Sequence, residues 1–325
     1  MTATPWASRA LDWIGQGHAA KAAEHAVKEA AKLGHFRGGS AGLLTEDGTL
    51  YGKCPRVAYL RSQGLEEPVD DNTREVFEAG YANEVIVLDL LRRGAAAHDP
   101  DLEVADGDGI ALTYQLPDGT PVSCRPDALV RVRETGQPVA GFEFKMAASL
   151  WSWTAVHYDR RPRSDHLIQA GHYSLRAGGA PFVLLYSCRA EFHLSTAPKW
   201  LQSKFPPGVY DVEYKDDGAT PLKLRPANRA YELTWRADGR LQYWTDGLDA
   251  PVPTEVTADA IERYYLRVAE IRDTLQLGPR PSGMAVDGSK SFMPCDYCDL
   301  KPVCDAHEAT GATWLDHARL KLAKE

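Results

Sequence analysis

The chain has 325 residues, of which 44% are hydrophobic and 25% are charged, which is the composition of an ordinary globular protein. The formal net charge of −8 excludes a uniformly basic protein that coats nucleic acid, although a local basic groove would suffice to bind phosphates. No apolar stretch reaches membrane-spanning length, the first residues lack a secretory signal pattern, and six cysteines in a chain of this length fit a reducing compartment, the cytoplasm.

Hydrophobic periodicity and turn signals predict a chain that mixes helices and strands. The expected elements are two short helices within 5–35, an amphipathic helix over 72–91, strands over 112–116, 122–132 and 139–145, a helix over 164–175, a buried strand over 181–188 and a helix over 257–275. This order predicts a mixed α/β core in which helices flank the sheet. Thr257 is the expected N-cap of the last helix.

These elements divide the chain into four segments. They are an N-terminal helical segment (1–53), a core (54–190), a β-rich insertion with several Pro and Gly turns (191–256), and a C-terminal helix followed by a cysteine-rich stretch (257–325). The helix over 72–91 is expected to bury one apolar face, made by Val76, Phe77, Val85, Val87, Leu88 and Leu91.

The stretch GFEFK, residues 141–145, carries the first chemical signal. Because side chains alternate between the two faces of a strand, Glu143 and Lys145 share one face, and Phe142 and Phe144 point into the core from the other. This pair suits a divalent-metal hydrolytic site, in which Glu143 and the Phe144 carbonyl bind the metal and Lys145 orients an attacking hydroxide. An E-x-K triplet alone more often marks a solvated face or an ion pair.

Asp127 carries the second signal, in the stretch RPDALV near the start of a strand. A hairpin joins this strand to the one that carries Glu143, and strand pairing would place the two carboxylates side by side. Two adjacent carboxylates are costly unless a cation neutralises them. Oxygen ligands favour Mg²⁺ or Mn²⁺, so the sequence predicts a site for one of these ions.

Two helices contribute further candidates. Gln169 and Tyr173 are four residues apart, hence on one helix face, where they could support Lys145 and contact a substrate. The alternative is an exposed Gln169 and a Tyr173 that packs in the core. Glu84 follows Gly80 by four residues on the earlier helix, and by itself it would be an ordinary solvated charge.

In this order, the G-x-x-x-E, P-D, E-x-K and Q-x-x-x-Y stretches resemble the RecB-like branch of the PD-(D/E)XK nucleases. The stretch CPRVAYL at 54–60 and the C-x2-C-x5-C spacing at 295–304 look like the iron–sulfur subset of that branch. This subset includes the CRISPR-associated nuclease family four, its phage-encoded relatives and the AddB-type helicase–nucleases. The resemblance implies a restriction-endonuclease-like core and metal-dependent hydrolysis of DNA. The residues it implies are Glu84, Asp127, Glu143 and Phe144 as metal ligands, with Asp127, Glu143, Lys145, Gln169 and Tyr173 as catalytic residues.

One position departs from the pattern of many members. They have a metal-binding histidine four residues after the glycine, where this chain has Glu84. Similar phage exonucleases also have an acidic residue there, so Glu84 remains a candidate ligand. The neighbouring Asn83 is the weaker candidate.

The cysteine-rich stretch admits two metal sites. The resemblance implies a structural [4Fe–4S] cluster held by Cys54, Cys295, Cys298 and Cys304, which would join the two ends of the chain. The local alternative is a Cys₃His zinc site in which His307 takes the place of Cys54.

The function that the resemblance implies is a DNA exonuclease that acts at ends or on single strands. Recombination, repair or phage DNA processing would be its setting, with a recombination or CRISPR protein as a partner. Candidate phosphate contacts are Arg160, Arg161 and Arg163, and candidate stacking surfaces for bases are Trp151 and Trp153. Two other hypotheses stay open: a nuclease that processes RNA, and a non-catalytic DNA-binding accessory protein of nuclease fold with a structural zinc.

Overall fold

The computed structural model describes most of the chain between residues 34 and 310. The described residues are 23, 34–38, 41–45, 50–65, 71–107, 112–147, 156, 160–188, 192–193, 210–214, 221–226, 228–274, 276–277, 284–286, 290–292, 295, 298 and 300–310. Their helices are α2 (Pro55–Ser62), α3 (Asp71–His98), α5 (Ser164–Arg176), α7 (Ala258–Thr274) and α8 (Lys301–Thr310). Among the described helices, none is long and apolar enough to cross a membrane.

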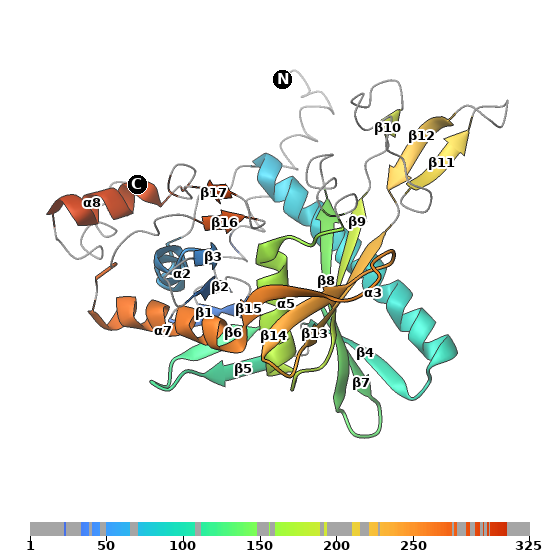
Figure 1. Cartoon of the computed structure of the whole chain (residues 1–325), viewed down its shortest axis with the longest axis horizontal. Helices are drawn as coiled ribbons and strands as arrows, with labels where there is room; N and C mark the ends of the chain where they lie inside the picture. The colour runs from blue at the N-terminus through green and yellow to red at the C-terminus, as the bar shows by residue number, and fades with distance from the viewer. Residues whose placement is uncertain are drawn as a thin grey trace, which may run out of the picture.

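A seven-stranded mixed sheet forms the centre of the molecule (Figure 1). In spatial order its strands are β15 (Val252–Thr257), β14 (Arg240–Trp244), β13 (Arg229–Trp235), β9 (Phe182–Cys188), β8 (Pro138–Ala147), β7 (Ala128–Val132) and β4 (Leu102–Asp106). Only β8 and β9 run parallel, and the other neighbours are antiparallel. A parallel pair requires a crossover connection, which contains α5. The predicted mixed α/β core is confirmed.

Three smaller sheets surround the central one. Their strand orders are β1 (Phe36–Arg37), β6 (Pro121–Cys124), β5 (Leu112–Gln115); then β17 (Lys290–Phe292), β16 (Met284–Val286), β3 (Leu50–Gly52), β2 (Gly42–Leu44); and β10 (Phe192–His193), β12 (Pro221–Pro226), β11 (Tyr210–Tyr214). Strand β16 pairs with β3, so segments more than 230 residues apart by number lie side by side.

The two faces of the central sheet are covered by different helices. On one face, Leu88 of α3 packs with Val104, Val130 and Phe144. On the other, α5 lies against β8, β9 and β13, and α7 packs on α5. Burial of apolar side chains on both faces fixes the position of each helix relative to the sheet.

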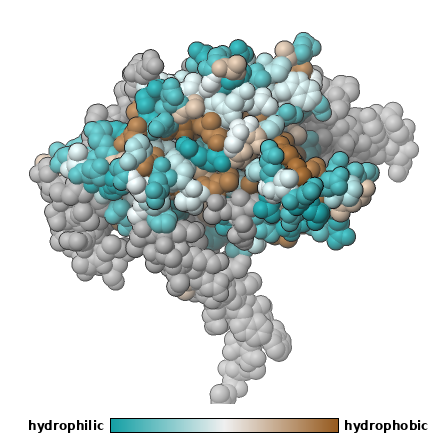
Figure 2. All heavy atoms as spheres, turned by 90° about the horizontal axis from the view of Figure 1, so that it is seen from below, coloured by the Kyte–Doolittle hydropathy of each residue, from teal (hydrophilic) through white to brown (hydrophobic). Residues whose placement is uncertain are grey.

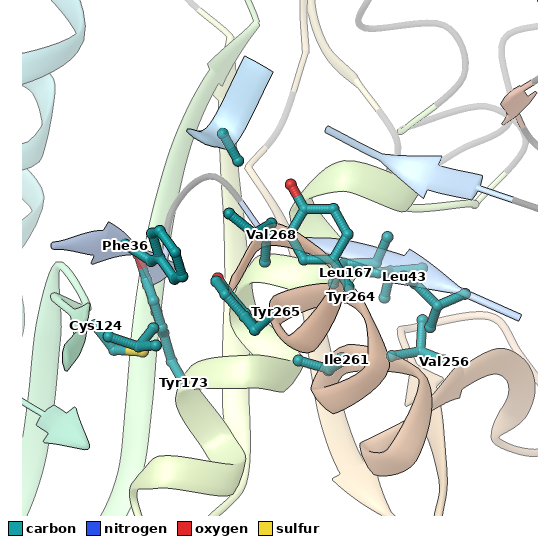
Figure 3. Packing of buried hydrophobic residues seen from close by; sticks show 14 of the residues in the cluster. Phe36, Leu43, Cys124, Leu167, Tyr173, Val256, Ile261, Tyr264, Tyr265 and Val268 are labelled. Carbon is teal, nitrogen blue, oxygen red and sulfur yellow. The ribbon is translucent and has the colours of Figure 1, made fainter. Parts of the chain in front are cut away.

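The larger of the two apolar clusters lies on the α5 side. In Figure 3, Tyr173 of α5 and Tyr265 of α7 lie near Phe36 and Cys124, and all four side chains are buried. From below the view of Figure 1, hydrophobic side chains gather in the middle of the surface and hydrophilic ones surround them (Figure 2).

The structure corrects the strand predicted over 122–132. Residues up to Cys124 belong to β6 and those from Ala128 to β7, and these strands lie in different sheets. Pro126 lies between them, and a proline cannot donate a hydrogen bond to a strand ladder. The break leaves Asp127 at the entrance of β7.

The structure also corrects the predicted helix over 72–91, which continues to His98. Its last turns include three consecutive alanines, the residue with the highest helix propensity. The apolar face is only half buried. Leu88, Val87 and Leu91 pack on the sheet, whereas Val76, Phe77 and Val85 are at least 50% exposed.

The helix and strand predictions around α5 and α7 hold within a residue or two. The Thr257 hydroxyl accepts a hydrogen bond from the Ala260 backbone N–H at 3.2 Å, as expected of an N-cap. Residues 191–256, expected to form a β-rich insertion, contribute β13, β14 and β15 to the same sheet as β8. The two helices expected within 5–35 fall outside the described residues, apart from 23, 34 and 35.

We predict that Gly141→Ala destabilises the fold by about 1–3 kcal/mol. A Cβ at Gly141 would lie 2.2 Å from the Phe182 ring, inside the core between β8 and β9. The control is Gly94→Ala, since a Cβ at Gly94 in α3 meets nothing within 4 Å and should stabilise the helix by ~0.5–1 kcal/mol. Urea denaturation of both variants measures the two effects, and equal stability of wild type and Gly141→Ala would contradict the packing argument.

Candidate active site and cysteine cluster

The β7–β8 hairpin brings Asp127 next to the GFEFK strand. Ala128 pairs with Phe142 in the antiparallel register, so Asp127 enters the hairpin opposite Glu143. The Asp127 Oδ2 atom accepts a hydrogen bond from the Phe144 backbone N–H at 2.6 Å. The predicted proximity of the two carboxylate-bearing strands is confirmed.

Alternation along β8 separates the two aromatic side chains from the two charged ones, as predicted. Phe144 is buried against α3, and Phe142 packs on the same cluster. Glu143 and Lys145 point to the α5 side, where both meet Gln169. Glu143 is almost completely buried, with an exposed fraction of only 2%.

Gln169 joins the two charged groups into one network. Lys145 Nζ donates to Glu143 Oε1 at 2.6 Å and to Gln169 Oε1 at 3.2 Å. The Gln169 amide nitrogen donates to Glu143 Oε1 at 2.7 Å and to the Tyr173 hydroxyl at 3.1 Å. The spacing of four residues on α5 therefore does place Gln169 and Tyr173 together, and Tyr173 also packs in the core with an exposed fraction of 2%.

The second oxygen of Glu143 is unusual. Glu143 Oε2 is buried and has no hydrogen-bond partner, a costly state for a charged oxygen. Burial raises the pKa of Glu143 to about 8, and the nearby carboxylates of Asp127 and Glu84 add to the rise, against the attraction of Lys145. Burial also raises the pKa of Asp127.

Lys145 is the cation that offsets these carboxylates. Burial acts to lower its pKa, but the charges of Glu143 and Asp127 outweigh burial, so its pKa is raised above the ordinary value. The ammonium group thus remains protonated. One Lys cannot satisfy both carboxylates and the orphaned Oε2 atom, and this surplus of buried acceptors is what a hard divalent cation would satisfy.

Glu84 lies near this network and lines a cavity, whereas its neighbour Asn83 is buried. Glu84 lines a cavity of about 550 Å³ with Tyr81, Arg92 and Arg125, and its charge raises the pKa of Glu143. Asn83, by contrast, is buried and donates to the Ser187 hydroxyl at 2.9 Å, so its amide serves packing between α3 and β9.

The predicted phosphate-contact arginines are largely engaged within the protein. Arg160 donates to the Gly247 carbonyl. Arg163 forms two hydrogen bonds with the Asp165 carboxylate, at 3.1 and 2.9 Å. Arg161 is exposed. The two tryptophans proposed to stack on bases, Trp151 and Trp153, lie outside the described residues.

The structure brings Cys54 and Cys304 close together. Burial raises the pKa of the Cys54 thiol to about 11, backbone N–H groups oppose the rise, and Cys304 is near enough to add to it. Cys54 and Cys298 both pack on the apolar cluster that contains Cys304, and the Cys298 N–H donates to the Cys295 carbonyl at 3.4 Å. The described cysteines are all free thiols.

Arg56 joins α2 to α8 and to the segment after α7, a contact that the sequence did not reveal. Its guanidinium is buried and donates to the Leu277 carbonyl at 3.1 Å and to Glu308 of α8 at 2.9 Å. The available signal was its position two residues after Cys54, beside a predicted metal ligand. The alternative zinc ligand, His307, is also buried on α8.

Neither predicted metal site is complete as a set of side chains. In the part of the chain that the structure describes, no three His, Cys, Asp or Glu side chains lie together in a group that could hold a metal ion. The acidic site offers two carboxylates, those of Asp127 and Glu143, and one oxygen of Glu143 has no partner. The ligand sets of both sites stay predictions.

Known proteins show only a weak similarity to this chain. No protein-family model matches the sequence, and no curated protein matches it. The crystal structure of an alkaline exonuclease from Laribacter hongkongensis is similar over 76% of this chain and 94% of that one, with 12% sequence identity and a TM-score of 0.30. Similarity at this level does not define an activity, so the proposals below rest on the residues of the site.

We predict that Glu143→Gln changes how the stability of the metal-free protein depends on pH. The folded state keeps a proton on Glu143 up to about pH 8, whereas the unfolded chain releases it near the usual value of 4.5. Wild-type stability should therefore fall as the pH rises from 4.5 to 8, by up to about 1.4 kcal/mol per pH unit. The Gln variant lacks this proton and should show a flatter profile.

Urea denaturation in EDTA at several pH values measures the difference between the two proteins. Addition of Mn²⁺ at pH 8 should then raise the melting temperature of the wild type and leave that of Glu143→Gln unchanged. Identical pH profiles for the two proteins would show that Glu143 is not held protonated in the fold.

Proposed function

We propose that this chain is a metal-dependent DNA exonuclease of the RecB-like PD-(D/E)XK type, which hydrolyses phosphodiester bonds at DNA ends or in single strands. The observation that carries the proposal is the buried network in which Glu143 Oε1 accepts from both Lys145 and Gln169 while its Oε2 atom has no partner. In an ion pair that serves only the fold, every buried carboxylate oxygen normally has a hydrogen-bond partner. The setting we propose is recombination, repair or phage DNA processing.

Each residue has a distinct task in this proposal. Asp127, Glu143 and the Phe144 carbonyl would hold Mg²⁺ or Mn²⁺, with Glu84 as a further ligand. When bound, the cation would neutralise the charge of the scissile phosphate and favour deprotonation of water. Lys145 has three N–H donors and uses two on Glu143 and Gln169, so the third can contact an incoming water or a phosphate oxygen.

Gln169 and Tyr173 act on Lys145 rather than on the substrate. The Gln169 carbonyl fixes the ammonium group, and the Tyr173 hydroxyl accepts from the Gln169 amide nitrogen, which sets the orientation of that amide. A preorganised ammonium needs little rearrangement as charge develops in the transition state. We therefore regard both as positioning residues.

We predict that Lys145→Ala lowers the rate of DNA cleavage by about 10²–10³-fold or more. End-labelled linear DNA, closed circular DNA and a single-stranded oligonucleotide, each incubated with Mg²⁺ or Mn²⁺, give the measurement. Arg236→Ala is the control, because Arg236 is a half-exposed cation paired with Asp238 at the β13–β14 turn. Cleavage by Lys145→Ala at the wild-type rate, or wild-type cleavage that persists in EDTA, would contradict the proposal.

We further propose a structural [4Fe–4S] cluster held by Cys54, Cys295, Cys298 and Cys304. In support, Cys304 adds to the raised pKa of Cys54 although 250 residues separate them by number, and Cys54, Cys295, Cys298 and Cys304 are free thiols. The contact from the buried Arg56 to Glu308 joins α2 to α8, beside the proposed ligands. Cysteine thiolates are the usual ligands of such a cluster.

We predict that anaerobically purified protein is brown and contains iron and sulfide, and that Cys54→Ala bleaches it and lowers its melting temperature. The zinc alternative makes the opposite prediction: a colourless protein whose zinc content is unaffected by Cys54→Ala and is lost in His307→Ala. Metal analysis with visible absorbance separates the two outcomes. Zinc-loaded, colourless protein from an iron-replete anaerobic preparation would exclude the cluster, and would leave the nuclease proposal standing on Lys145.

A further inference from the structure

His166 lies on the face of α5 that turns toward the proposed active site. It precedes Gln169 by three residues, so it occupies the same helix face one turn earlier. Its imidazole contacts Tyr186 of β9, the residue that pairs in register with Lys145 of β8. Lys145 and His166 are near enough for the charge of the lysine to affect the pKa of the histidine.

The hydrogen bonds of Tyr186 fix the tautomer of His166. The Tyr186 oxygen accepts from the Arg163 backbone N–H at 3.3 Å and lies 2.8 Å from His166 Nδ1. If Nδ1 carried the proton, two donors would point at one oxygen, and the hydroxyl proton of this buried tyrosine would have no acceptor among the described residues. Such a loss is costly inside a protein. The hydroxyl therefore donates to Nδ1, and the imidazole proton is on Nε2.

The Nε2–H group of His166 has no acceptor among the described residues. The nearest carboxylate oxygen, Asp165 Oδ2, is 4.0 Å away, beyond hydrogen-bond distance. Both Asp165 oxygens already accept from Arg163. The side chain of His166 is 18% exposed, so a ligand can reach the ring edge.

The electrostatic surroundings keep His166 neutral. Burial lowers the pKa of His166 to about 3, and the positive charges of Lys145, Arg163 and Lys53 act in the same direction, against the opposing charge of Asp165, which pairs with Arg163. The imidazole is therefore neutral at ordinary pH. A neutral N–H donor with Lys145 and Lys53 nearby suits a phosphate oxygen.

We propose that His166 binds the nucleic-acid strand, with its Nε2–H donating a hydrogen bond to a phosphate oxygen beside Lys145. This inference rests on the proposed nuclease function and adds a substrate-binding residue to it. It also gives Arg163, just before α5, a role in the arrangement: its guanidinium pairs with Asp165, and its backbone N–H donates to the Tyr186 oxygen. Arg163 thereby helps to position His166.

The test compares two substitutions of similar size in the full chain. His166→Gln keeps an N–H donor close to the position of Nε2, whereas His166→Met has none. Fluorescence anisotropy with a labelled single-stranded oligonucleotide in EDTA measures binding without cleavage, and KM and kcat with Mg²⁺ are measured in parallel. We expect about tenfold weaker binding and a raised KM for His166→Met, and near-wild-type values for His166→Gln.

Two further variants guard against a purely structural effect. Tyr186→Phe leaves His166 in place but releases Nδ1, so the tautomer is no longer fixed and binding should weaken a few-fold. His98→Ala, an exposed histidine at the end of α3, should change nothing. Thermal melting confirms that each variant is folded.

The outcomes separate the two proposals. A folded wild type that neither binds nor cleaves DNA would overturn the nuclease function and this inference with it. Cleavage by the wild type, together with equal affinity and KM for His166→Gln and His166→Met, would overturn the role of His166 alone. If His166→Met does not fold, unchanged binding by Tyr186→Phe would overturn it instead.

Discussion

A carboxylate placed almost out of contact with water is the constraint on which the site depends. Glu143 sits in the middle of the central sheet, and an isolated buried charge would be prohibitively costly there. Lys145 and Gln169 compensate one of its oxygens and leave the other without a partner. The β7–β8 hairpin and α5 bring these three side chains together.

The helix α5 meets this requirement because it is the crossover between β8 and β9. Two parallel neighbouring strands oblige the chain to return across one face of the sheet, so α5 must lie over β8. Its apolar residues pack in the core, while His166, Gln169 and Tyr173 project along one side toward β8 and β9. The same geometry that builds the core therefore also positions the polar groups of the site.

The segments around α2 and those that follow α7 lie side by side. Strand β16 pairs with β3, α2 packs on α7, and the buried guanidinium of Arg56 bonds both to Leu277 and to Glu308. A buried cation of this kind is specific rather than strongly stabilising, since it must find its partners or remain unpaired. This contact holds the segments that carry Cys54 and Cys304 next to each other without any metal.

The sequence by itself determined the alternation along GFEFK, the helix face shared by Gln169 and Tyr173, and the hairpin that carries Asp127 to Glu143. These depend on the short-range periodicities of strands and helices, which do not change with context. It could not determine the break at Pro126 that divides β6 from β7, the exposure of Phe77 on α3, or the union of β13 to β15 with the central sheet. Nor could it reveal the tautomer of His166 or the reach of Arg56 to Glu308. Burial and hydrogen-bond partners depend on residues distant in the chain, and only the packing of the whole fold decides which of them meet.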